Sequence, residues 1–187
     1  MSLTSKLSRY IPEVAGPKKK LAFNDKLKWT GLILLMYFVL LHIPLYGLGV
    51  NALSQFESLS TILGASFGSL ISLGIGPIVT ASIVLQLLVG SGILNMDISK
   101  PEGRAKFQSL QKVFILAFVL FEAVIYVMMG GLAPLATSSA YGLMQAILIL
   151  QLIVGGYMIV LMDGVAQKWG FGSGVSLFIA AGVSREI

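Results

Sequence analysis

The sequence contains no cysteine, a single histidine and few charged side chains. The absence of cysteine excludes disulfides, thiolate zinc sites, iron–sulfur clusters and cysteine nucleophiles, and His42 alone cannot make a multi-histidine metal site. Aspartate, glutamate, lysine and arginine together make up 11% of the 187 residues, whereas soluble domains carry about 25%. We therefore expect no cofactor, no bound metal and a main solvent other than water.

Apolar residues make up 56% of the chain, and its mean hydropathy is +0.90. About 20 apolar residues of helix cross the roughly 30 Å core of a bilayer. The apolar runs predict an all-α, polytopic membrane helix bundle of five transmembrane segments with one re-entrant half-helix. The predicted spans are residues 29–48, 75–94, 107–130, 141–162 and 173–187; the half-helix is 56–70, and residues 1–28 form a polar arm.

Lysine and arginine are distributed unevenly about these spans. Seven of the 13 lie in the first 28 residues, four in or just after the loop 95–106, and one at Lys168, which leaves only Arg185 on the other side. Cytoplasmic loops carry the excess of basic residues. We therefore predict a multi-pass protein of the cell membrane with a cytoplasmic N-terminus and an outward C-terminus. The polar first 28 residues argue against a cleavable signal peptide.

The apolar region 56–94 is too long for one crossing and too short for two with a loop between them. Residues 56–73 are rich in serine and glycine, whereas residues 75–94 are strongly apolar. Gly74, Gly76 and Pro77 lie between the two parts and predict a helix break, because proline removes a backbone donor and glycine tolerates the bend. Broken backbone at membrane depth persists only beside protein or a water-filled cavity. We therefore expect this hinge to border an aqueous path.

Glu122 lies well inside the third predicted span, where an ionisable group costs about 2.5–3.5 kcal/mol on insertion scales. It should therefore face protein or water. Two interpretations remain open: a gate, proton or ion site, or a protonated carboxyl hydrogen-bonded to a neighbouring helix. Thr80, on the helix after the break, is its candidate partner.

Two pairs of branched aliphatic residues follow the glycine clusters at i, i+4 spacing: Ile75 with Val79, and Val175 with Ile179. Each pair lines one helix face. Such pairs most often pack against lipid or core. Beside broken helices, they are also compatible with a hydrophobic constriction that gates by dewetting.

Four segments together resemble the archaeal type of the SecY (Sec61α) family, the pore subunit of the protein-conducting channel. They are KWTG (28–31), LGIGPIVT (73–80), QLLVGSG (86–92) and GSGVSLFI (172–179). The resemblance covers nearly the whole chain. Members of this family have ten transmembrane helices in two inverted halves, so the chain is similar to the N-terminal half, and its end after a short fifth segment suggests a longer protein.

The resemblance implies roles for particular residues. Ile75, Val79, Val175 and Ile179 match the hydrophobic pore ring, where Val175 replaces a frequent isoleucine. Thr80 and Glu122 match the polar cluster of the lateral gate, and Gly74, Gly76 and Pro77 form the hinge. The half-helix matches the plug that closes the pore, with apolar residues Phe56, Leu59, Ile62, Leu63, Phe67 and Leu70.

The implied function is passage of secretory polypeptides across the membrane and release of membrane segments through the lateral gate, without enzymatic activity. The implied partners are SecE/Sec61γ-type and Secβ-type small subunits, the ribosome, signal sequences, nascent polypeptides, lipid and the C-terminal half of the same protein. A secondary transporter with a broken-helix site is the alternative, because half-helix ends also face bound ions in transporters. An intramembrane enzyme would need a nucleophile–base pair or a metal set, which we do not find.

Overall fold

The computed structural model describes residues 14–17, 19–51, 61–63, 65–97, 99–134 and 140–185. Over these residues the chain is predominantly helical, as predicted. The helices are α2 (Phe23–Leu41), α4 (Gly76–Gly90), α5 (Pro101–Met128), α6 (Tyr141–Trp169) and α7 (Gly174–Arg185), and the strands are β1 (Leu48–Asn51) and β2 (Leu132–Pro134).

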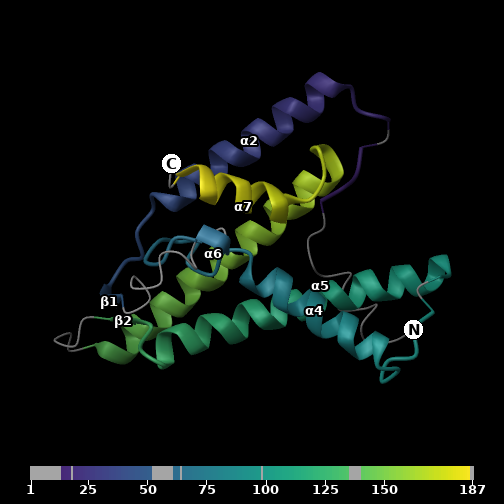
Figure 1. The fold of residues 1–187 in the computed structure, drawn as a ribbon. Helices are drawn as coiled ribbons and strands as arrows, with labels where there is room; N and C mark the ends of the chain where they lie inside the picture. The colour runs from purple at the N-terminus through teal and green to yellow at the C-terminus, as the bar shows by residue number, and fades with distance from the viewer. Residues whose placement is uncertain are drawn as a thin grey trace.

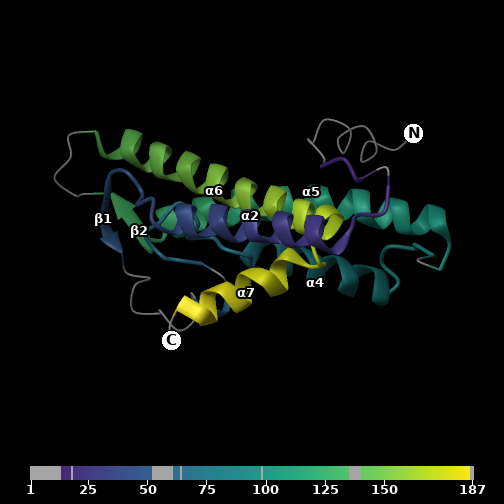
Figure 2. The ribbon, with the colours of Figure 1, turned by 90° about the horizontal axis from the view of Figure 1, so that it is seen from above.

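Helix α6 is the centre of the bundle. It packs against α2, α5 and α7, and α4 packs along α5. Figure 1 shows α2 and α7 on one side of α6 and the α4–α5 pair on the other. Both views place the short strands at one end of the bundle (Figures 1 and 2). A hydrophobic cluster built from α2, α4, α5, α6 and α7 joins these parts, with fully buried Tyr37, Leu148, Leu152 and Phe178 among its members.

Helices α5 and α6 are long and apolar enough to cross a membrane by length and composition. At 1.5 Å per residue, their 28 and 29 residues extend about 42 Å. Helices α4 and α7 are also apolar but have only 15 and 12 residues. The structure therefore supports membrane-spanning helices, and the count of five spans stays a prediction.

Two helices extend into segments that the sequence predicts as loops. Helix α5 begins at Pro101 rather than near residue 107, because Lys100 is extended and proline fits the first helical turn, where its missing N–H is not needed. Helix α6 continues to Trp169 rather than ending near 162, because no proline interrupts it, Gly164 is tolerated within it, and the buried Asp163 and Ala166 pack inward.

Helix α2 is shifted towards the N-terminus relative to the predicted span 29–48. It begins at Phe23 and ends at Leu41. The early end follows from Pro44, which disfavours the helical conformation at the residue before it. Pro44 instead forms an isolated antiparallel bridge with Ser69.

The predicted half-helix 56–70 does not continue to residue 70. Residues 61–62 are helical, but residues 67–75 form turns, interrupted by the bridge at Ser69. Gly68 has a φ of 95°, which is incompatible with a right-handed helix. The hydroxyls of Ser69 and Ser72 donate to the carbonyls of Ser66 and Ser69, and such local bonds compete with helix formation.

The two strands pair antiparallel at one end of the bundle, with Val50 opposite Ala133 and Asn51 opposite Leu132. This pairing joins the loop after α2 to the loop after α5 (Figure 1). The sequence does not predict this pairing, because three- and four-residue strands carry almost no periodic signal.

Candidate functional site

The predicted helix break is present between residues 65–75 and α4. Gly74 has a φ of 53°, and a Cβ atom there would collide with the Leu63 carbonyl and lie 2.7 Å from the Ala65 Cβ. The Ile75 amide donates to the Leu63 carbonyl at 2.8 Å. Helix α4 then begins at Gly76, with Pro77 in its first turn. Only glycine allows the chain to fold back this closely.

Residues 65–75, which we call the hinge segment, lie between the loop after α2 and helices α5 and α6. The Leu45 amide donates to the Gly68 carbonyl, and the Leu70 amide donates to the Ile43 carbonyl, both at 2.9 Å. The Phe67 ring lies edge-on to Tyr126 of α5, with ring centroids 6.5 Å apart. The segment is therefore part of the packed bundle.

The predicted plug residues do not form one uniform element. Phe56 and Leu59 lie outside the described residues. Ile62 is 60% exposed, and Leu63, Phe67 and Leu70 are half-buried. The described part of the predicted plug therefore grades from an exposed helical turn into the packed hinge segment.

The four predicted pore-ring residues lie at the starts of α4 and α7. Ile75 is 2% exposed and belongs to the hydrophobic cluster. Val79, Val175 and Ile179 are half-buried and pack against the same cluster. The structure thus brings both pairs to one apolar body, each pair on the first turns of its helix.

Thr80 and Glu122 are brought together by the packing of α4 on α5. The Thr80 hydroxyl forms a hydrogen bond with the Glu122 carboxyl group. Gly76 lies directly beneath, because a Cβ atom there would be 3.0 Å from Oε2 of Glu122. The carboxyl group is therefore seated at the helix break, with a polar partner one turn further along α4.

A cavity of about 380 Å³ opens between α4, α5, α6 and the start of α7. Its apolar lining includes Ile78, Ile115 and Val175, and its polar lining includes Gln108, Gln111, Lys112, Tyr157, Asp163 and Gln167. Val14 of the N-terminal arm also lines it, because the Val14 and Ala15 carbonyls accept hydrogen bonds from Lys168 and Trp169. The arm thus covers part of this cavity.

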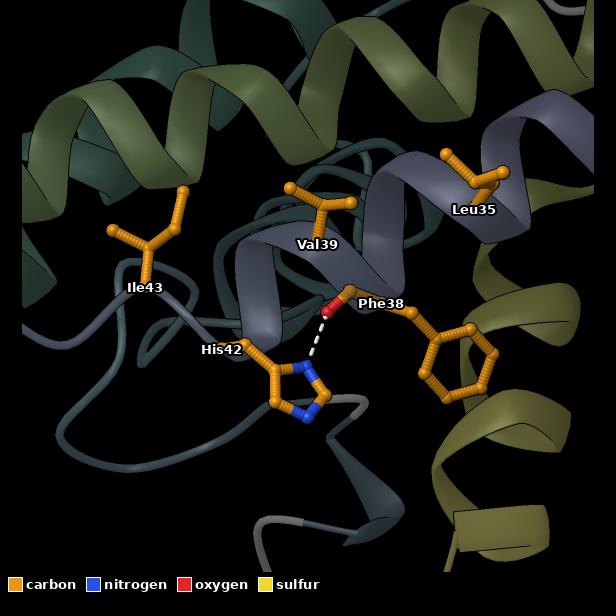
Figure 3. Close-up of a pocket in the computed structure, with 5 residues that line it drawn as sticks. All are labelled: Leu35, Phe38, Val39, His42 and Ile43. Atoms are coloured by element: carbon orange, nitrogen blue, oxygen red, sulfur yellow. Dashed lines mark hydrogen bonds between the residues drawn. The ribbon is translucent and has the colours of Figure 1, made fainter.

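A second, shallow groove lies on the exposed face of α2 and is lined by Leu35, Phe38, Val39, His42 and Ile43 (Figure 3). The His42 ring turns back along the helix, and its Nδ1 lies 2.7 Å from the Phe38 carbonyl oxygen. The remaining lining is apolar. The His42 ring therefore contacts the last turn of α2.

Sequence reasoning missed three contributors to this region. Asp163, assigned to a loop, is a buried residue of α6. The contact of Gly155 with the hinge segment is the second, because the Leu70 carbonyl lies where its Cβ atom would be. Gln111 of α5 donates to Ser82 of α4 at 2.8 Å. No spacing pattern in the sequence marks these residues, because each partner lies on a different element.

The chain resembles known proteins over almost its whole length. A sequence model of the SecY family matches residues 69–187. The protein translocase subunit SecY of Methanothermobacter thermautotrophicus is 54% identical over 177 residues, which are 95% of this chain and 38% of that relative. The Pyrococcus furiosus subunit of the same name is 43% identical over 97% of this chain and 38% of its own length. The chain therefore spans well under half the length of these relatives.

Solved structures agree with the sequence matches. A protein-conducting channel superposes with a TM-score of 0.87 at 42% identity, covering 99% of this chain and 41% of that one. Sec61 in the canine ribosome–channel complex from the endoplasmic reticulum gives the same TM-score and identity, over 99% of this chain and 42% of that one. The fold is thus that of a helical membrane protein. The chain belongs to the SecY family.

Proposed function

We propose that this chain forms one wall of a pore through which secretory polypeptides cross the membrane and from which membrane segments leave sideways. The observation that carries the proposal is the helix break at Gly74, which joins a packed, non-helical hinge segment to α4. Irregular backbone at membrane depth needs protein or water beside it. Neighbouring helices cover the hinge segment itself, and the proposed path runs beside the first turns of α4 and α7; the family membership supports this assignment.

Within this proposal, Ile75, Val79, Val175 and Ile179 contribute to a hydrophobic ring. Branched aliphatic side chains close around a polypeptide of any sequence without hydrogen-bonding to it, and they exclude water when the pore is empty. The plug comprises Phe56, Leu59, Ile62, Leu63, Phe67 and Leu70, with Gly74, Gly76 and Pro77 as its hinge. Thr80 and Glu122 contribute to the lateral gate between α4, α5 and the rest of the protein.

The channel acts passively and without catalysis, so a partner supplies the driving force. The solved relative in a ribosome–channel complex supports the ribosome as one partner. SecE/Sec61γ-type and Secβ-type subunits, signal sequences and nascent polypeptides, lipid and the C-terminal half of the same protein complete the assembly. The transporter alternative draws on Thr80 and Glu122 beside the break and on the polar lining of the 380 Å³ cavity. We favour the channel because the chain belongs to the SecY family.

The pore assignment is tested in the full-length protein, reconstituted into planar bilayers. Replacing Ile75 and Val79 by serine should raise the ion conductance of the resting channel. The matched control replaces Ile83 and Leu87, which have the same spacing on α4 but are 52% and 66% exposed. Equal conductance in both double variants and in the unmodified channel would refute the pore assignment.

We also propose that the N-terminus and the loop between α4 and α5 lie in the cytoplasm. The loop before α6 then lies on the outer side of the cell membrane. The charge asymmetry supports this orientation. Because the chain lacks cysteine, Ser99→Cys and Ala140→Cys give clean labelling sites. A membrane-impermeant maleimide should label position 140 in intact cells and position 99 only after lysis; the reverse pattern would invert the topology.

A further inference from the structure

Asp163 is a buried carboxylate at the junction of α6 and α7. Its residue is 7% exposed. Oδ1 accepts a hydrogen bond from the Val175 amide at 3.3 Å, and Oδ2 accepts one from Nε2 of Gln167 at 2.7 Å. The Gly174 amide is a further backbone donor to this carboxylate. Buried charge is tolerated only when it is hydrogen-bonded in this way.

The two backbone donors, Gly174 and Val175, lie in the first turn of α7. A helix leaves its first N–H groups without intrahelical acceptors, and a negative charge there is favourable. Asp163 fills that role from another helix, eleven residues earlier in the chain. The turn that connects the two helices contains Gly170 and Gly172, and Gly172 has a φ of 141°. Such a turn does not by itself set the position of the first turn of α7; Asp163 holds that first turn, whereas Phe178 packs further along the helix against Tyr37.

Gly174 makes this close approach possible. A Cβ atom at position 174 would lie 2.7 Å from the Asp163 Cα and 2.8 Å from its Oδ1. It would also lie 3.2 Å from the Ala166 Cβ. The backbone of α7 therefore rests directly on α6 at Asp163, and the two residues form one contact.

We infer that Asp163 is a positioning residue for the hydrophobic ring: it fixes the first turn of α7 and thereby the places of Val175 and Ile179. The link is short, because Val175 both donates its amide to Asp163 and presents its side chain to the cavity and the cluster. Ile179 follows one turn later on the same helix. The effect on the channel rests on the proposed function, whereas the effect on α7 does not.

Two readouts on the full-length protein test the inference in Asp163→Ala and Asp163→Asn. The first is amide hydrogen exchange of residues 174–176. We expect at least tenfold faster exchange in the alanine variant and a smaller change in the asparagine variant, which keeps one acceptor oxygen. Asp97→Ala removes an exposed carboxylate, salt-bridged to Lys100, and should leave this exchange unchanged. Unchanged exchange in both Asp163 variants would overturn the inference.

The second readout is the resting ion conductance in planar bilayers. We expect a higher conductance in Asp163→Ala than in Asp97→Ala, with Asp163→Asn between them. If the serine variant of Ile75 and Val79 leaks but both Asp163 variants stay closed despite faster exchange, Asp163 does not position the ring. If that serine variant does not leak, the proposed function fails, and hydrogen exchange alone decides whether Asp163 positions α7.

Discussion

The carbonyl oxygen of Leu70 occupies the place where a side chain at position 155 would begin. Helix α6 therefore carries glycine where the hinge segment crosses it, and the neighbouring Gly156 faces Leu73 and Val119, with atoms 3.0 Å from where its Cβ would lie. The hinge segment therefore packs directly on α6 at these two glycines.

Replacing Gly155 by alanine should displace the hinge segment, since the obstructing atom belongs to backbone. We expect a loss of about 1–3 kcal/mol in stability, as for other overpacked interiors. Gly31→Ala is the control, because nothing lies within 4 Å of a Cβ at that helical position. The melting temperatures of both variants are measured by thermal unfolding of the purified protein in detergent. Equal melting temperatures would show that the hinge segment moves aside without a loss of stability.

Gln151 of α6 holds the loop after α2 through two hydrogen bonds. The Tyr46 amide donates to its Oε1 at 2.8 Å, and its Nε2 donates to the Tyr46 carbonyl at 3.2 Å. Gln151→Leu removes both, so the Tyr46 amide should exchange with solvent roughly tenfold faster, the equivalent of about 1.4 kcal/mol. Gln145→Leu, on the same helix, should have no such effect. Equal Tyr46 exchange in the two variants would contradict the role of Gln151.

Helices α4 and α5 are joined by a side-chain relay. Gln111 donates to Ser82 at 2.8 Å, and Ser82 donates to the Ile78 carbonyl at 2.6 Å. A double-mutant cycle with Ser82→Ala and Gln111→Ala should give a coupling energy of about 0.5–1.5 kcal/mol. Unfolding free energies of the four proteins measure it. Additive effects would mean that the two side chains act independently.

Both tryptophans of the chain form one contact at the end of α6. The Trp29 and Trp169 ring centroids are 5.2 Å apart, and Trp169 Nε1 donates to the Ala15 carbonyl at 2.7 Å. Trp169→Phe keeps a ring but loses the donor, so the arm should detach more often. Trypsin should then cleave after the exposed Lys19 several-fold faster, while Tyr141→Phe at the other end of α6 should leave the rate unchanged. A rate unaffected by Trp169→Phe would show that other contacts retain the arm.

The features that could be predicted from the sequence were those that depend on local sequence patterns. Apolar runs indicated the helices, and two glycines with a proline indicated the break before α4. Helix ends were less predictable, because they depend on caps and packing: Asp163 read as the start of a loop, yet its partners on α7 allow α6 to continue past it. In the sequence, a charged residue after an apolar run looks the same whether the helix ends there or continues.

The partly wrong half-helix has a similar origin. The serine and glycine content of residues 56–73 did not reveal that the hydroxyls of Ser69 and Ser72 donate to the backbone carbonyls of Ser66 and Ser69, where a helix was predicted. The Thr80–Glu122 pairing was predictable as a candidate because both residues lay on neighbouring predicted spans. The contacts of Gly155, Gln111 and Gln151 required coordinates, since nothing in their sequence surroundings names the partner.

The small sheet has a mechanical consequence. Because the sheet ties the loop after α2 to the loop after α5, it anchors the packed α4–α5 pair at the C-terminal end of α5. A rotation of about 5° around this anchor would carry the other extremity of a helix about 42 Å long through roughly 4 Å. A tilt of this size would thus be magnified, along the helix, into a displacement about the width of a side chain.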